Sequence, residues 1–307
     1  MHTEAFVFKG FHGKELPAVL WLPEGEIRAV LQLTHGMTEH VGRYEDFAGQ
    51  LTAQGIAVAG FDLRGHGKNP GDALVASFGE GGWEAALMDM HLFFAHIEEK
   101  FPGVPHHMLG FSLGSFLLRE YLGRWPDGVK SAIIMGTGYQ PGFVLTVMQA
   151  IVGGQIKKGG FDNTTDLVRQ LSFGAYNQKF KPNRTSSDWL CADEKSLDGY
   201  LADPLCRKDI SSGLFWQLLG AMKRTGAKNA CENWRKDMPV LLLSGANDPV
   251  GDMGKGVTSV KKQLDKAGMQ CVEMQLLPGA RHILLSEHAG GAAKKACEII
   301  LNWLKNG

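Results

Sequence analysis

Residues 107–118 read HMLGFSLGSFLL, and this stretch decides the fold of the 307-residue chain. It places Ser112 between Gly110 and Gly114, at the point where an apolar run of the strand type passes into a helical pattern. Glycines on both sides remove the Cβ atoms that would clash in so sharp a turn, and the turn exposes the serine hydroxyl. The start of the following helix offers backbone N–H groups to a developing negative charge. The stretch therefore predicts a nucleophilic serine at a strand-to-helix turn.

Short apolar runs typical of strands extend from this turn in both directions along the chain. Amphipathic helical patterns separate several of them, with apolar residues at three- and four-residue spacing over 83–97 and again over 293–304. This alternation predicts an α/β fold with a mostly parallel, doubly wound sheet of about eight strands. The first two runs are too close together for a crossover helix, so we expect an antiparallel pair at the sheet edge. The runs are EAFVF, AVLWL, AVLQL, IAVAGFD, HHMLGF, SAIIMG, VLLLSG and CVEMQLL.

The alternation stops between residues 139 and 234, where short helical patterns rich in large apolar residues replace the strands. We therefore expect a core made of residues 1–138 and 235–307, with 139–234 inserted as a helical lid over the sheet edge. Within the lid, the apolar stretch 143–152 has three interpretations: lining of an acyl channel, contact with a membrane surface, or packing inside the lid.

Composition excludes several classes of protein. The 32 basic and 32 acidic residues form no long run of one sign, so the electrostatic footprint of a nucleic-acid binder is missing. The five cysteines are odd in number and have no CxxC spacing, which favours reduced thiols in the cytoplasm over a disulfide framework or a thiolate zinc site. Neither a signal peptide nor an apolar run of about 18 residues is present. We expect a soluble, cytoplasmic protein.

A nucleophilic serine needs a base, and the base needs an acid that orients it. Asp248 follows the apolar run 240–245 in a loop, and His282 lies in the loop before the last helix. The chain order Ser112, Asp248, His282 is the order of a serine hydrolase built on this type of sheet. Asp252 is the competing acid and ranks second, because it lies further from the end of the strand.

Stabilisation of an oxyanion needs two backbone N–H donors, and the sequence predicts Leu113 and Met37. Leu113 follows the serine, and Met37 follows Gly36 in the loop after the third apolar run. We interpret His35, two residues before Met37, as a side chain that holds this loop rather than as a base. No HExxH motif or phosphate-binding loop occurs, so we expect neither a metal nor an organic cofactor.

Five stretches together resemble the α/β-hydrolase superfamily, and within it the monoacylglycerol lipase and lysophospholipase branch, which is grouped with serine aminopeptidase-like hydrolases. The resemblance covers nearly the whole chain and implies that Ser112 is the nucleophile, His282 the base and Asp248 its orienting acid. The animal monoacylglycerol lipases carry His and Met where this turn has Phe111 and Leu113. The stretches are THGMTEHVGRYEDFA, FDLRGHGKNPG, GFSLGS, SGANDPVGD and GARHILLSE.

The pattern as a whole predicts a lidded serine hydrolase that cleaves a small-molecule carboxylic ester with a lipid-like acyl chain, and whose lid touches a membrane surface transiently. Two alternatives stay open. One is an amide-cleaving enzyme similar to proline iminopeptidases, which would need lid carboxylates to bind a free amino terminus. The other is a ligand-binding homologue without turnover. The sequence predicts no particular acyl chain length, leaving alcohol or oligomeric state. The lid carboxylates are Asp188, Asp193, Glu194, Asp198 and Asp203.

Overall fold

The computed structural model describes residues 1–69, 75–79, 81–206 and 209–306. Parts of the predicted core and lid, and the end of the stretch FDLRGHGKNPG, lie outside these residues. The described residues form an eight-stranded sheet of order β1-β2-β4-β3-β6-β7-β9-β10, and all eight predicted runs belong to it. Its strands are β1 (His2–Lys9), β2 (Glu15–Leu22), β3 (Ala29–Thr34), β4 (Ile56–Phe61), β6 (His106–Phe111), β7 (Val129–Met135), β9 (Val240–Gly245) and β10 (Val272–Leu277).

The direction of the strands decides where a site can form. β1 pairs antiparallel with β2 at the sheet edge, as predicted, and β2 is antiparallel to β4. All the remaining pairs, from β4 to β10, are parallel. Every residue of β3, β4, β6 and β9 is buried, which explains their continuous apolar runs. The carboxyl ends of these parallel strands meet at one edge of the sheet, where ligands bind in this class of fold.

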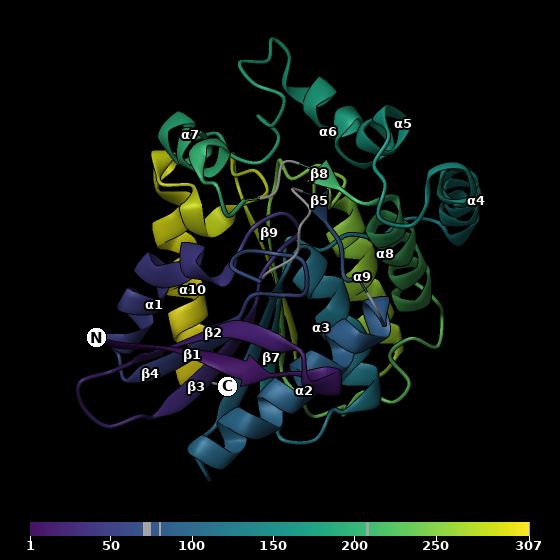
Figure 1. Ribbon diagram of the computed structural model, residues 1–307. Coiled ribbons are helices and arrows are strands. Elements are labelled where there is room, and N and C mark those ends of the chain that lie inside the picture. Colours follow the sequence, from purple (N-terminus) through teal and green to yellow (C-terminus); the bar gives the residue numbers. More distant parts are fainter. Residues whose placement is uncertain (70–74, 80, 207–208, 307) are drawn as a thin grey trace.

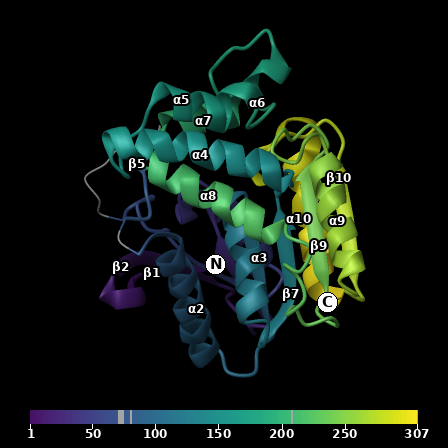
Figure 2. The ribbon, with the colours of Figure 1, turned by 90° about the vertical axis from the view of Figure 1, so that its right-hand side faces the viewer.

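Helices cover both faces of the sheet (Figures 1 and 2). α1 and α10 pack on one face, and α2, α3, α8 and α9 pack on the other. The helical patterns predicted over 83–97 and 293–304 are confirmed as α2 and α10. Their bounds are α1 (Glu45–Thr52), α2 (Gly82–Lys100), α3 (Leu113–Arg124), α8 (Ser212–Thr225), α9 (Lys255–Lys266) and α10 (Ala292–Asn306).

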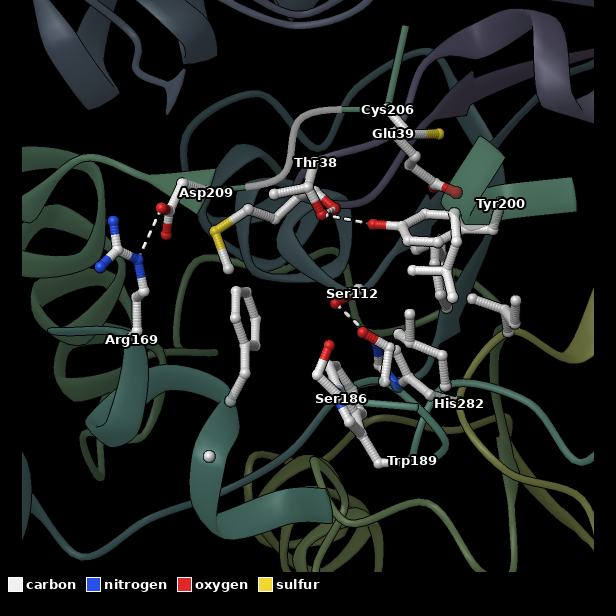
Figure 3. A pocket seen from close by; sticks show the side chains of 18 of the residues that line it. Thr38, Glu39, Ser112, Arg169, Ser186, Trp189, Tyr200, Cys206, Asp209 and His282 are labelled. Atoms are coloured by element: carbon white, nitrogen blue, oxygen red, sulfur yellow. Dashed lines mark hydrogen bonds and ion pairs between the residues drawn. The ribbon is translucent and has the colours of Figure 1, made fainter. Parts of the chain in front are cut away.

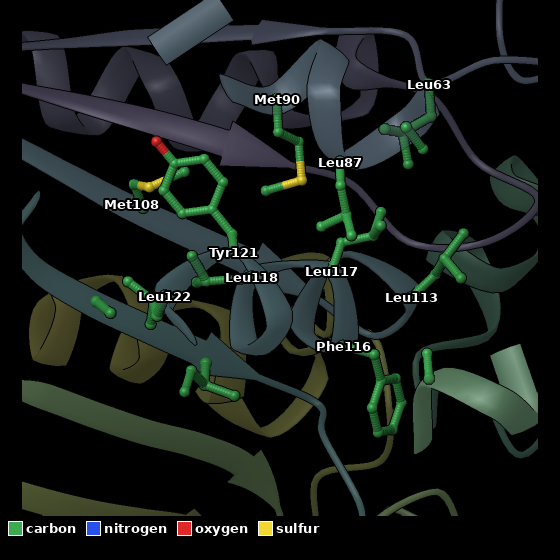
Figure 4. Packing of buried hydrophobic residues seen from close by; sticks show 14 of the residues in the cluster. Leu63, Leu87, Met90, Met108, Leu113, Phe116, Leu117, Leu118, Tyr121 and Leu122 are labelled. Atoms are coloured by element: carbon green, nitrogen blue, oxygen red, sulfur yellow. The ribbon is translucent and has the colours of Figure 1, made fainter. Parts of the chain in front are cut away.

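The helix α3 is held on almost every side by the core. Its side chains from Leu113 to Leu122 are buried but for one partly exposed position, and several of them pack with Leu87 and Met90 of α2 and with Met108 of β6 (Figure 4). A helix packed in this way cannot shift without opening a cavity in the core. The start of α3, and with it the turn at residue 112, is therefore fixed.

The chain between β7 and β9 carries most of the remaining helices. α8 packs into the same core cluster as α2 and α3, and α4 lies along α8 (Figure 2). The sequence predicted no strand here, yet the two-residue β8 pairs with β5. So short a strand leaves no periodic signal in the sequence and could not be predicted from it. No helix of the described residues is long and apolar enough to cross a membrane. These elements are α4 (Gly142–Gly159), α5 (Asp166–Arg169), a π-helix (Gln170–Gly174), α6 (Ala175–Asn177), α7 (Glu194–Ala202), β8 (Asp209–Ile210) and, before α2, β5 (Val75–Ala76).

Candidate active site

The turn between β6 and α3 is strained at its serine. Ser112 has φ 50° and ψ −113°, a conformation that a residue with a side chain rarely adopts. A Cβ on Gly110 would lie 2.3 Å from the Gly114 carbonyl oxygen, and a Cβ on Gly114 would lie 2.2 Å from the Thr34 carbonyl oxygen. Both positions therefore require glycine, which is the physical reason for the Gly-x-Ser-x-Gly pattern.

The structure brings together the three side chains that the sequence singled out. His282 Nε2 lies 2.9 Å from Ser112 Oγ, and His282 Nδ1 lies 2.9 Å from Asp248 Oδ2 (Figure 3 shows the first pair). Asp248 is fully buried and His282 nearly so, while Ser112 is partly exposed to a cavity. An ionised Asp248 has no proton to donate, so Nδ1–H donates to it and Nε2 is free to accept the serine proton.

The acid Asp248 is held by its own loop and strand. Val250 N–H donates to Oδ1 at 2.8 Å, and Ser244 Oγ lies 3.2 Å from Oδ2. Burial, followed by the negative charge of Asp248, raises the pKa of the Tyr176 hydroxyl to about 12. The competing acid Asp252 is about half exposed and pairs with Lys179 Nζ at 3.6 Å. The structure therefore places Asp248 at the imidazole, and it places Asp252 at the surface.

The two predicted N–H donors lie on adjoining segments. Leu113 is the first residue of α3, so its N–H has no acceptor within the helix. Met37 lies in the loop after β3, and it lines the same cavity as Ser112. The close approach of Gly114 to the Thr34 carbonyl shows that the start of α3 abuts the end of β3. This arrangement can bring both N–H groups to one bound oxygen.

His35 holds the loop that carries Met37, as predicted from the sequence. Leu63 N–H donates to His35 Nε2 at 2.9 Å, and the opposite ring nitrogen donates to the Gly36 carbonyl at 2.7 Å. Burial lowers the pKa of His35 to about 4, so the ring is neutral near pH 7. Sequence reasoning missed Glu39, whose Oε1 accepts Gly36 N–H at 2.6 Å. Its position in the stretch THGMTEH was the available signal.

A cavity of about 560 Å³ opens over Ser112 and His282 (Figure 3). Its apolar walls come from the loop after β3 and from the segments around the π-helix and α7. Most of these residues could not be predicted from the sequence, because loop positions carry no periodic signal. The lining residues are Met37, Thr38, Glu39, Phe111, Ser112, Arg169, Gln170, Phe173, Gly174, Ser186, Ser187, Trp189, Leu190, Tyr200, Leu201, Cys206, Asp209, His282 and Ile283.

The apolar stretch 143–152 does not line this cavity. On α4, Phe143, Val147 and Ile151 are 74%, 58% and 41% exposed. Leu145 and Val152 of the same stretch are buried and pack in the hydrophobic core, so packing accounts for these two. Neither packing nor an acyl channel fits the three exposed side chains.

Among the described residues, the side chains of His40, Asp203 and Cys206 lie close enough together to hold a metal ion, with their ligand atoms within 4.8 Å of one another. Their contacts have another explanation. His40 Nε2 and Asp203 Oδ2 form a hydrogen bond of 2.8 Å that joins the loop after β3 to the end of α7. Burial raises the pKa of the Cys206 thiol to about 12, and the Arg43 guanidinium lies beside it, which disfavours a further cation. We assign this group a structural role.

Comparison with known proteins places the chain among α/β-hydrolases. The family model "Hydrolase_4: Serine aminopeptidase, S33" matches residues 25–289. The monoglyceride lipase of Mus musculus is 25% identical over 276 residues, covering 90% of this chain and 82% of that protein. The monoglyceride lipase homolog of Monkeypox virus is 32% identical over 288 residues, covering 93% of this chain and 92% of the homolog.

A solved structure gives the same result for the fold. The crystal structure of a highly thermostable carboxyl esterase from Bacillus coagulans, in complex with glycerol, superposes with a TM-score of 0.90 at 24% identity, over 99% of this chain and 98% of that one. At this level of identity the likeness shows the fold alone. It confirms the α/β-hydrolase fold that the sequence predicted.

Proposed function

We propose that this chain, which belongs to the Hydrolase_4 family (serine aminopeptidase, S33), is a serine hydrolase that cleaves carboxylic esters with a lipid-like acyl chain. One observation carries the proposal: hydrogen bonds connect Asp248 to His282 and His282 to Ser112, and the serine opens into a largely apolar cavity. Relatives named as monoglyceride lipases, which the chain matches over about nine-tenths of its length, support the ester as the bond that is cleaved.

The reaction follows from the positions of these groups. His282 Nε2 takes the proton of Ser112 Oγ while that oxygen bonds to the ester carbonyl carbon, and Asp248 stabilises the imidazolium that forms. The N–H groups of Met37 and Leu113 hold the resulting oxyanion, worth about 3 kcal/mol for each donor. His282 then protonates the leaving alcohol, and water repeats the two steps on the acyl-enzyme. These steps need no metal or organic cofactor.

The charges of the cavity favour a neutral alcohol over an anionic headgroup. Among the described lining residues, Arg169 is the one Lys or Arg. It already pairs with Asp209 at 2.6 Å and with Asp166, so it carries no unbalanced positive charge. Glu39, the other charged group of the lining apart from Asp209, pairs with Arg43 at 3.6 Å, so the described lining offers no free cation to an anionic headgroup. We therefore propose a monoacylglycerol-like ester rather than a lysophospholipid.

Among the described residues, two carboxylates line the cavity, and both are already engaged: Asp209 pairs with Arg169, and Glu39 accepts hydrogen bonds from Gly36 N–H and the Tyr44 hydroxyl, so neither is free to bind the amino terminus of an amide substrate. None of the five lid carboxylates, as the structure describes them, is among the lining residues. Asp188 accepts hydrogen bonds from the 184–185 main chain, Asp193 accepts one at the start of α7, and Asp203 accepts one from His40. The complete hydrogen-bonded set at Ser112 likewise argues against a binding protein without turnover.

A panel of substrates tests the proposed function. We expect turnover of monoacylglycerols and of p-nitrophenyl esters, with lysophospholipids slower and aminoacyl amides slower still. A fluorophosphonate should add covalently to Ser112, which peptide mass spectrometry would locate. Faster turnover of aminoacyl amides than of acyl esters would support the peptidase alternative, and no adduct at all would contradict the serine hydrolase.

We also propose that the inserted segment 139–234 acts as a lid that contacts lipid surfaces through α4. Phe143, Val147 and Ile151 recur every four residues and so lie along one side of the helix. The helix carries Lys157 and Lys158 at its end and no acidic residue, which suits an anionic interface.

The five cysteines are free thiols, which supports our proposal that the protein works in the cytoplasm.

Simultaneous replacement of Phe143, Val147 and Ile151 by serine should reduce binding to anionic phospholipid vesicles by at least about tenfold. Each of the three apolar side chains contributes favourable free energy of binding when it moves from water into the lipid interface. Vesicle co-sedimentation measures the change, and hydrolysis of a soluble ester should stay as in the wild type. Val7→Ser is the matched control, since Val7 is 61% exposed on β1, far from α4. Equal vesicle binding by the triple variant and the wild type would contradict the contact.

A further inference from the structure

The loop that carries His282 is hydrogen-bonded to the inserted segment. We name residues 280–288 the base loop and residues 188–192 the strap. The strap precedes α7, and the N–H groups of His282 and Ile283 both donate to the Leu190 carbonyl of the strap, at 3.0 and 2.8 Å. The main chain on which the imidazole stands is thus anchored to the insertion as well as to the sheet.

A buried carboxylate joins the same two segments a second time. Glu287 is 1% exposed. Its Oε1 accepts Ala192 N–H of the strap at 2.9 Å, and its Oε2 accepts Arg281 N–H of the base loop at 2.8 Å. Burial raises the pKa of Glu287, which shows the cost of keeping a carboxylate in this place. A buried acid with both oxygens engaged by main-chain N–H groups fixes the distance between the two segments.

Two side chains add to the contact between the strap and the base loop: Trp189, beside the imidazole, and Arg281, the residue before His282. The Trp189 ring of the strap lies 5.2 Å from the His282 ring and stacks with Phe173 of the π-helix at 5.6 Å. The Arg281 guanidinium donates to the Asp188 and Cys191 carbonyls of the strap. The strap therefore touches the imidazole itself and the residue before it.

We propose that the strap positions His282, and that Glu287 is the positioning residue that couples the two. The base loop is irregular apart from one short 3-10 turn, Leu284–Ser286, so it has little regular structure of its own to aim the ring. A displacement of the strap carries the Leu190 carbonyl and Trp189 with it, and moves Nε2 away from Ser112 Oγ. Transfer of the Ser112 proton to His282 is therefore coupled to the position of the inserted segment over the cavity. The proposal rests on the proposed function, in which His282 is the base.

Glu287→Gln tests the coupling with little change of volume. The amide keeps one oxygen for one N–H and turns an NH₂ group toward the other, so one of the two links breaks. We expect kcat for a soluble p-nitrophenyl ester to fall by about 10- to 100-fold with KM within about threefold, because a displacement near 1 Å at the reacting atoms costs that much. In the proton NMR spectrum, the low-field resonance of the His282 Nδ1–H should shift or broaden.

Two further variants keep the test decisive. Ser131→Ala, which removes a buried hydroxyl between His107 and Trp303 at the far end of the sheet, should lower the thermal unfolding midpoint and leave kcat and the low-field resonance unchanged. Arg281→Lys should reduce kcat in the same direction as Glu287→Gln and by less, so the test survives if Glu287→Gln does not fold.

The possible results separate the two proposals. If kcat and the low-field resonance of a folded Glu287→Gln match the wild type, the coupling is wrong, and Arg281→Lys at the wild-type kcat overturns it equally. If the wild type itself neither hydrolyses esters nor takes up a fluorophosphonate at Ser112, the proposed function fails instead.

Discussion

Ser112→Ala is expected to lower kcat for a soluble ester by about 10⁴- to 10⁶-fold while the protein folds as before. The alanine has no oxygen to form the acyl-enzyme, so the residual rate comes from substrate binding and from the Met37 and Leu113 N–H groups, which still stabilise the oxyanion when water attacks the ester directly. Stability should hardly change, because within the described part of the chain the hydroxyl has a single hydrogen-bond partner, His282 Nε2.

The measurement compares pre-steady-state kinetics of the two proteins with a p-nitrophenyl ester. The wild type should release a burst near one equivalent of p-nitrophenol per chain, and the Ser112→Ala variant should release none. A variant with an unchanged melting temperature and more than about a hundredth of the wild-type kcat would show that another group is the nucleophile. Such a result would overturn the proposed mechanism together with its site.

Much of the fold could be predicted because its central strands are buried on both faces. β3, β4, β6 and β9 show this as uninterrupted apolar runs, which are hard to mistake. The glycines around Ser112 could also be interpreted from the sequence as a requirement of a sharp turn. In the structure a Cβ at either position would lie 2.2–2.3 Å from a carbonyl oxygen, so only glycine fits. Chain order and strand ends then singled out Asp248 and His282, and the structure brings His282 to the serine and Asp248 to the far side of the imidazole.

The rest could not be predicted because its contacts depend on the main chain or on long-range packing. The Leu190 carbonyl accepts two N–H groups that lie about 90 residues further along the chain, and a carbonyl has no residue type to recognise. The apolar patterns between residues 139 and 234 predicted short helices, but such a pattern does not say which surface a helix covers, and α8 packs in the core beside α3. Cavity-lining residues such as Trp189 lie in loops, where no periodic pattern marks them in the sequence.

The second large effect on kcat is expected from replacing Asp248, the acid assigned to orient His282, in comparison with Asp252, the competing acid. Asp248→Asn should lower kcat by about 10³- to 10⁴-fold, because the amide no longer compels Nδ1 to carry the proton and no longer stabilises the imidazolium. With Nδ1 accepting from the amide NH₂, Nε2 holds a proton and cannot take the one on Ser112. The nucleophile stays in place but loses its base.

Asp252→Asn is the matched control, since it makes the same substitution four residues away. Its carboxylate is about half exposed and pairs with Lys179 at 3.6 Å, so its loss should leave kcat within about twofold of the wild type. Steady-state kinetics of both variants, with melting temperatures to show that both fold, decide between them. A large loss in Asp252→Asn with little in Asp248→Asn would exchange their roles and would require the loop after β9 to rearrange in solution. Because Asp248 also accepts Val250 N–H and pairs with Ser244, its variant should melt at a lower temperature, and the control should not.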